Sequence, residues 1–236
     1  MYMIFNEADQ SVISTGVNFN EFVSSFPAGL SNILLLASGY TGQDFHSGLR
    51  MDFVRKERLE EFYREDVYKY GDFCWIDFGS MPALDQLEPQ EKAELLYLGH
   101  YHQPLNTPFF DKLSNRFVYL AHDDGWYNKI YYRDIQDYTI MLQHIFPAKW
   151  HARKRKVKTL GLDAAEQLTS LASKGVLVEW NRTIKTRNSL EIPLNIIGEI
   201  LNLDDLYNNL EKLKAKAEAE YRLVYKDKHW TVNSVK

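Results

Sequence analysis

The stretch Phe117-Val-Tyr-Leu-Ala-His-Asp-Asp-Gly-Trp-Tyr-Asn-Lys-Ile-Tyr-Tyr132 decides the fold that we expect for this chain of 236 residues. Its two ends, 117–121 and 127–132, are rich in the aromatic and β-branched residues typical of strands. Asp123-Asp124-Gly125 stands between them, and these residue types tolerate the positive φ of a tight turn. The stretch therefore predicts a β-hairpin of two antiparallel strands.

Further strands and helices are predicted on both sides of this hairpin. Gly99 is expected to end a helix that begins at Pro89, and Pro193 argues against a central strand around it. The predicted strands are 3–5, 32–37, 73–78, 176–180, 223–225 and 230–235, and the predicted helices are 17–26, 50–70, 89–98, 135–145, 163–173 and 203–219. Helices interleaved with hairpins predict an α+β fold, with a mixed or antiparallel sheet packed against helices and a smaller α+β domain after it.

The charges divide the chain into two parts. Residues 1–147 carry 11 Lys and Arg against 21 Asp and Glu, a net −10, whereas residues 148–236 carry 17 against 11, a net +6. Pro147 stands where the charge changes sign and is expected to end the preceding helix. The sequence thus predicts an acidic α+β domain over 1–147, a basic linker over 148–158 and a smaller basic α+β domain over 159–236.

Composition excludes several classes of protein. With 45% apolar and 25% charged residues, the chain is neither disordered nor fibrous, and its longest clean apolar run, 33–37, is far too short to span a membrane. Cys74 is the single cysteine, so no disulfide forms within the chain, and its apolar neighbours predict a core thiol rather than a nucleophile. No basic stretch follows Met1 as in a secretory signal. We therefore expect a soluble cytoplasmic protein.

Two segments carry a resemblance to known proteins. Glu94-Leu-Leu-Tyr-Leu-Gly-His-Tyr-His-Gln-Pro104 and the stretch 115–133 resemble a group of uncharacterised soluble bacterial proteins, some of which carry the transferred name oxalate:formate antiporter. This resemblance implies a bacterial origin but no known activity. The antiporter name would imply about a dozen membrane helices, which this sequence lacks, so transport is excluded on physical grounds.

Histidines and an acid within these segments are candidate metal ligands. His100 and His102 flank Tyr101, and in an extended backbone such a pair directs both imidazoles to one side. His122 and Asp123 follow at the hairpin turn. Imidazoles with a carboxylate suit a divalent transition-metal ion, so these four residues are the ligands of a possible metal-dependent hydrolase. The complete H-x-H-x-D-H spacing is absent, and turn chemistry explains Asp123 equally well.

The basic run is a candidate nucleic-acid site. Six cations within ten residues can neutralise phosphates, although a solvated linker explains the run equally well. The predicted helix 163–173 that follows carries acidic residues, whereas a reader of the major groove should present basic and amide side chains. The cations are Lys149, Arg153, Lys154, Arg155, Lys156 and Lys158.

Aromatic residues crowd the hairpin and suggest a protein interface. Trp126, Tyr127, Tyr131 and Tyr132 are of the types enriched at interfaces, because they bury a large area and keep a polar atom. The acidic first part would attract a basic partner. Our leading hypothesis is therefore a binding protein with a protein partner or a second copy of itself; the metal-dependent hydrolase and a nucleic-acid-binding regulator are the alternatives.

Overall fold

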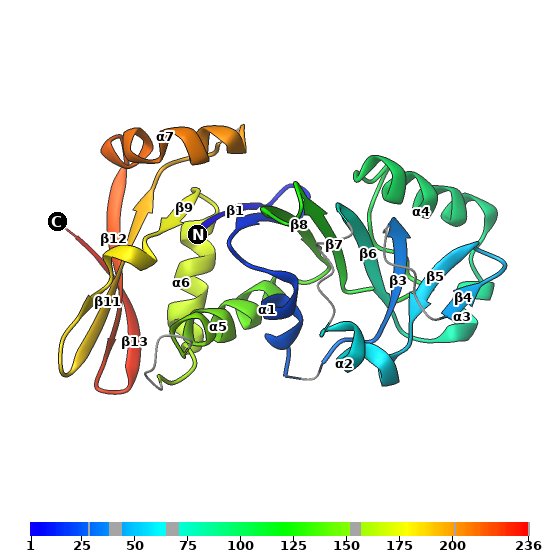
Figure 1. Ribbon diagram of the computed structural model, residues 1–236, viewed down its shortest axis with the longest axis horizontal. Helices are drawn as coiled ribbons and strands as arrows, with labels where there is room; N and C mark the ends of the chain where they lie inside the picture. Colours follow the sequence, from blue (N-terminus) through cyan, green and yellow to red (C-terminus); the bar gives the residue numbers. More distant parts are fainter. Residues whose placement is uncertain (28, 38–43, 65–70, 152–156, 201, 236) are drawn as a thin grey trace. The chain divides into compact units, whose positions relative to one another are not determined.

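The chain has the α+β fold predicted from its sequence, with antiparallel strand pairing and helices packed on the strands (Figure 1). The computed structural model describes all residues except 28, 38–43, 65–70, 152–156, 201 and 236. Two compact units are formed, one by residues 9–11 and 17–135 and the other by residues 1–8, 12–16 and 136–236. We call them the acidic unit and the basic unit. The first contains 11 Lys and Arg against 19 Asp and Glu, a net −8, and the second 17 against 13, a net +4.

The division between the units differs from the boundary expected at residue 147. Helix α5 (Ile135–His151) runs through Pro147, and the carbonyl of Gln143 that a proline cannot bond accepts the N–H of Leu160 instead, at 3.1 Å. Strand β1 (Tyr2–Asn6) belongs to the basic unit, because Tyr2 pairs with Leu177. The two units do carry net charges of opposite sign, but the change of charge along the sequence at residue 147 does not locate the boundary between them.

The acidic unit is built on an antiparallel sheet in the order β8-β7-β6-β3-β5-β4. The predicted hairpin is present, with Phe117 paired to Tyr132 and His122 to Tyr127, and the predicted strands at 32–37 and 73–78 are also confirmed. The strands are β3 (Asn32–Ala37), β4 (Asp44–His46), β5 (Met51–Val54), β6 (Phe73–Phe78), β7 (Phe117–His122) and β8 (Tyr127–Tyr132).

The long helix expected over 50–70 is wrong. Its first residues form β5, in which Phe53 pairs with Leu34 of β3, and only η1 (Lys56–Arg58) and α2 (Leu59–Phe62) are helical. Pairing of this segment with a buried apolar strand outweighs the local helical periodicity of its sequence. The last residues of the predicted helix, 65–70, lie outside the described part of the chain.

Helices cover both faces of the acidic unit's sheet. On one face, Cys74, Ile76 and Leu120 share a buried cluster with residues of α3 (Met81–Asp85) and α4 (Pro89–Tyr101). On the other face, Phe19 of α1 (Phe19–Ser24) packs edge-on against Trp75 at 5.7 Å. Alternate residues of each strand therefore lie in two separate cores, one of which lies under α4.

Helix α4 contacts β3 and β6 and continues further than predicted (Figure 1). It begins at Pro89 as expected, but Gly99 lies inside it, and His102 is the C-cap in the left-handed conformation with φ 53°. A β-carbon at Gly99 would lie 2.8 Å from the carbonyl oxygen of Leu36. Gly99 therefore permits close packing on β3 and does not end the helix.

The basic unit contains strands in the order β13-β12-β11-β9-β1-β2, with β10 paired to β11. The predicted strands 223–225 and 230–235 are present and form a terminal hairpin, whose turn uses Asp227 and Lys228 at φ 49° and 66°. Its elements are β2 (Ser11–Thr15), α6 (Leu162–Ala172), β9 (Val176–Val178), η3 (Trp180–Arg182), β10 (Ile184–Lys185), β11 (Ser189–Ile196), α7 (Leu203–Ala215), β12 (Ala219–Lys226) and β13 (His229–Ser234), besides α5 and β1. None of the described helices is long and apolar enough to cross a membrane.

Two predictions in the basic unit need correction. Pro193 lies in β11, which is a central strand between β12 and β9. Proline has no N–H to donate, but the pairing of β11 with β9 covers only residues 194–196. Pro193 therefore contributes only its carbonyl on this side, which accepts the N–H of Glu179 at 3.0 Å. Helix α7 ends at Ala215 rather than at 219, since strand β12 begins at Ala219.

Candidate functional site

The structure separates the two histidines that flank Tyr101. His100 lies on the exposed side of the last turn of α4, whereas His102 is the C-cap of that helix. The backbone here is helical and not extended, so residues two apart point to different sides. The interpretation of His100 and His102 as a chelating pair is therefore wrong.

His122 stands at the centre of a row of side chains across three strands. It is the last residue of β7 and pairs with Tyr127 of β8. On its other side, Phe73 of β6 pairs with Ala121, and continuing that antiparallel register by one residue places Asp72 opposite His122. Residues opposite each other in a sheet share a face. Asp72, His122 and Tyr127 thus form one row on the face that α4 covers.

His102 reaches this row from the end of α4. Its ring centroid lies 5.2 Å from that of His122, with the two rings edge to face at 66°. Tyr127 stacks on His122 at 4.9 Å and 13°. The carboxylate of Asp72 accepts the backbone N–H of Asp124 at 3.2 Å, which holds it at the same end of the sheet. We call His102, His122, Tyr127 and Asp72 the histidine cluster.

Two of the four predicted metal ligands thus converge, and two do not contribute to the cluster. Asp123 is exposed in the hairpin turn with φ 52°, as turn chemistry predicts. The carboxylate near the imidazoles comes instead from Asp72, which sequence reasoning missed. Within the described residues, no group of three or more His, Cys, Asp or Glu side chains is positioned to hold a metal ion.

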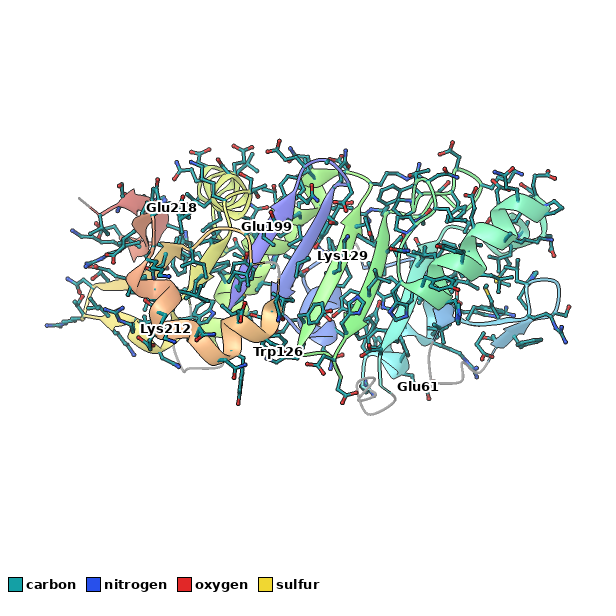
Figure 2. The ribbon with its side chains drawn as sticks, turned by 90° about the horizontal axis from the view of Figure 1, so that it is seen from above. Glu61, Trp126, Lys129, Glu199, Lys212 and Glu218 are labelled. Carbon is teal, nitrogen blue, oxygen red and sulfur yellow. The ribbon has the colours of Figure 1, made fainter. Side chains whose placement is uncertain are left out.

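Both imidazoles of the cluster favour the neutral form. Partial burial lowers the pKa of His102, and the carboxylate of Asp72 opposes this effect without cancelling it. Partial burial also lowers the pKa of His122, where His102 and Lys129 add to the lowering. Figure 2 shows Lys129 along β8, and its ammonium group pairs with Asp9 at 3.1 Å. Burial thus favours the neutral imidazole, in which one ring nitrogen keeps a free lone pair.

The four aromatic residues proposed for a partner fall into two groups. Tyr131 lies in the core under α4, and Tyr132 packs against Phe117 at 5.8 Å on the opposite face of the sheet, so both are buried. Neither is available to a partner, because helices cover both faces of this sheet. Trp126 and Tyr127 are half-buried at the turn end of the hairpin, where Figure 2 labels Trp126.

An exposed apolar surface lies on α4, where the sequence analysis did not place one. Leu96 is 56% exposed and Tyr101 58%, and Tyr97 stacks on Tyr101 at 4.7 Å. These three residues, with Ala93 and His100, follow the i, i+3, i+4, i+7 and i+8 spacing of one helix face, which we call the outer α4 face. The sequence indicates this second apolar side by its uninterrupted run of apolar and aromatic residues over 95–98. A helix with a single buried side would have polar residues at some of these positions.

The remaining predicted sites lie elsewhere. Of the basic run, Lys149 is half-buried in α5 and Lys158 is exposed, while Arg153, Lys154, Arg155 and Lys156 lie outside the described residues. The backbone of Lys158 is tied to the terminal hairpin, because its carbonyl accepts the indole N–H of Trp230 at 2.8 Å. Nucleic-acid binding by this run stays a prediction. Cys74 is completely buried, as expected of a core thiol.

Comparison with known proteins gives no family and no relative from which an activity can be transferred. No family model, no curated protein and no solved structure matches this chain. The resemblance of the segments at 94–104 and 115–133 to uncharacterised bacterial proteins stays a prediction. Function must therefore be inferred from the residues and their surroundings.

Proposed function

We propose that this protein binds a partner protein through the outer α4 face, and that the partner presents a basic apolar segment. The observation that carries the proposal is the exposure of Leu96 and Tyr101 at 56% and 58% on one side of a helix whose other side is already buried. Large apolar side chains that share one exposed helix face are typical of interaction sites.

Helix α4 has two apolar sides, which is unusual for a helix on a protein surface. Leu95 and Leu98 fill the core against the sheet. A single apolar stripe would complete the packing of this helix, and the opposite side would then be polar. Leu105, 53% exposed in the loop that follows, extends the apolar surface beyond the helix. Burying a leucine or tyrosine side chain on binding contributes about 1.5–3 kcal/mol before the costs of association.

The charge of the acidic unit indicates the kind of partner. The unit carries a net −8, and exposed carboxylates of Asp72, Asp123 and Asp124 stand at the hairpin end where α4 terminates. A positively charged segment is attracted over long distances by such a surface, which raises its rate of encounter. A second copy of the acidic unit would be repelled, so we favour a different protein over self-association.

Two synthetic peptides test this function on the complete chain. The first is an amphipathic helix of Leu and Lys, and the second is its counterpart of Leu and Glu. We expect the Lys peptide to bind, with affinity that falls as salt is raised from 50 to 300 mM, and the Glu peptide not to bind, because salt screens the attraction. Fluorescence anisotropy of labelled peptides measures both.

A matched pair of variants locates the binding surface. Leu96→Gln keeps a good helix former and removes the apolar group, and we expect it to weaken Lys-peptide binding at least tenfold. Leu162→Gln changes a leucine of similar exposure, 50%, in α6 of the basic unit and should leave binding unchanged. Equal affinities of the two variants would contradict the proposed surface.

The proposal includes a cytoplasmic location for the protein. Its support is the single thiol of Cys74, which is free and buried and needs no oxidising compartment.

A further inference from the structure

We propose that His102 and His122 together bind one divalent transition-metal ion, such as Cu²⁺ or Zn²⁺, as a pair of imidazole ligands. This site is separate from partner binding by the outer α4 face and stands or falls independently of it. It also differs from the four-ligand site predicted from sequence, since His100 and Asp123 take no part.

The separation of the two rings fits one shared ion. Metal–nitrogen bonds to histidine are about 2.0–2.1 Å long, and the ring centroid lies about 1.1 Å beyond the nitrogen, so two imidazoles at a tetrahedral angle have centroids about 5 Å apart. The centroids of His102 and His122 are 5.2 Å apart. The rings now meet edge to face at 66°, so binding requires the two rings to reorient.

The backbone holds the two histidines in place from distant parts of the chain. His102 is fixed as the C-cap of α4, where its N–H donates to the carbonyl of Leu98 at 2.8 Å. The backbone of His122 is fixed by the pairing of β7 with β8, where His122 lies opposite Tyr127. Ligands on rigid elements lose little freedom on binding, which favours affinity.

Electrostatics around the pair also favour a cation. Asp72 acts on both rings with a negative charge, and the backbone N–H of Asp124 holds its carboxylate in place. A nearby carboxylate increases the attraction for a cation. Lys129 opposes this field, but Asp9 pairs with it at 3.1 Å.

Two protein ligands leave the other coordination positions to water. We therefore expect an affinity in the micromolar range rather than that of a closed structural site, which uses four protein ligands. Cu²⁺ should bind more tightly than Zn²⁺, following the general order of stability of divalent ions. Because protons compete for the same nitrogens, binding should weaken as the pH is lowered.

Titration of untagged, complete protein with Cu²⁺ and Zn²⁺ tests the site, with calorimetry for affinity and electron paramagnetic resonance for the nitrogen ligands of Cu²⁺. We expect one equivalent of Cu²⁺ with two imidazole nitrogens. His102→Asn keeps a residue that tolerates positive φ at the cap, and His122→Phe keeps a ring on Tyr127. Each variant should lose one nitrogen from the spectrum and weaken binding at least tenfold.

His100→Asn is the matched control, because it removes an exposed histidine two residues from His102. It should bind Cu²⁺ with the affinity and spectrum of the unchanged protein. Circular dichroism first establishes that each variant is folded. Absence of stoichiometric binding by the unchanged protein, or two-nitrogen binding that survives both His102→Asn and His122→Phe, would overturn the proposal.

Discussion

A β-carbon on Gly99 would lie 2.8 Å from the carbonyl oxygen of Leu36 and 2.9 Å from its β-carbon. Helix α4 thus packs directly on the backbone of β3 at this position. This contact fixes which side of α4 faces the sheet, and therefore which side is left exposed with Leu96 and Tyr101. The outer α4 face and the position of His102 both depend on it.

Gly99→Ala should destabilise the protein by about 1–3 kcal/mol, because the added methyl group meets backbone atoms that cannot move without shifting the strand. The sign of this change in the free energy of unfolding is informative. Glycine within a helix ordinarily costs about 1 kcal/mol relative to alanine, so a position with free space would be stabilised by the same change. Urea denaturation measures the difference, and a stabilised variant would show that α4 does not pack as described.

The buried carboxyl group of Asp77 allows a second test of the core of the acidic unit. Its carboxylate is almost completely buried and accepts the backbone N–H groups of Arg116 and Phe117 at 2.9 and 2.8 Å. Burial outweighs these bonds and raises the pKa of Asp77 from 3.8 to about 6. The folded protein therefore binds more protons than the unfolded chain between these two pH values.

The free energy of unfolding should then fall as the pH rises from about 4 to about 6, by up to roughly 3 kcal/mol from this group. Asp77→Asn keeps an oxygen that can accept the same two N–H groups but cannot ionise, so it should remove this loss. The measurement is urea denaturation of both proteins from pH 4 to pH 7. Parallel pH profiles for the two proteins would show that the pKa of Asp77 is not raised in the folded protein.

Glu179 and Lys214 provide a test within the basic unit. The carboxylate of Glu179 is 4% exposed, and it accepts hydrogen bonds from Lys214 at 2.6 Å and from Asn195 at 2.8 Å. Removing one partner of a buried carboxylate is destabilising, because the charge is left with fewer donors. Lys214→Met should therefore cost about 1–3 kcal/mol, with Arg182 and Asn195 limiting the loss.

Lys212 is the matched control for Lys214. It is exposed and lies on the same helix (Figure 2), and among the interactions described for it, it bonds only the side chain of Asn209, at 3.3 Å. Lys212→Met should change the free energy of unfolding by less than about 0.5 kcal/mol, as is usual for exposed positions. Equal effects of the two substitutions on thermal unfolding would exclude a special role for the buried pair.

Sequence patterns predicted those elements of the fold whose signals are local. The hairpin around Asp123-Asp124-Gly125, the strand 73–78 and the start of helix α4 at Pro89 follow from turn chemistry, aromatic content and capping. The helix over 50–70 failed because pairing with β3 is a long-range effect. The expectation that Pro147 would end the helix also failed because of a long-range contact. The carbonyl of Gln143, which a proline cannot bond, accepts the N–H of Leu160 from outside the helix.

The candidate site was predicted only in part. His102 and His122 were both selected, but their contact depends on how α4 ends, and the extended backbone assumed for His100 and His102 gave the wrong pair. Asp72 would have been found from the register of β6 with β7, which pairs Phe73 with Ala121, but a single sequence does not fix register. The two apolar sides of α4 correspond to the apolar run 95–98, which is longer than one buried side of a helix requires.

Photo-cross-linking in the cells that produce the protein tests its proposed function most directly. A benzophenone amino acid replaces Tyr101 on the outer α4 face or, as the control, Tyr207, an aromatic residue of the basic unit that is 77% exposed. We predict a discrete adduct from position 101 only, in which mass spectrometry identifies a protein cross-linked through a basic apolar segment. No adduct at position 101, or the same adducts from both positions, would contradict the account.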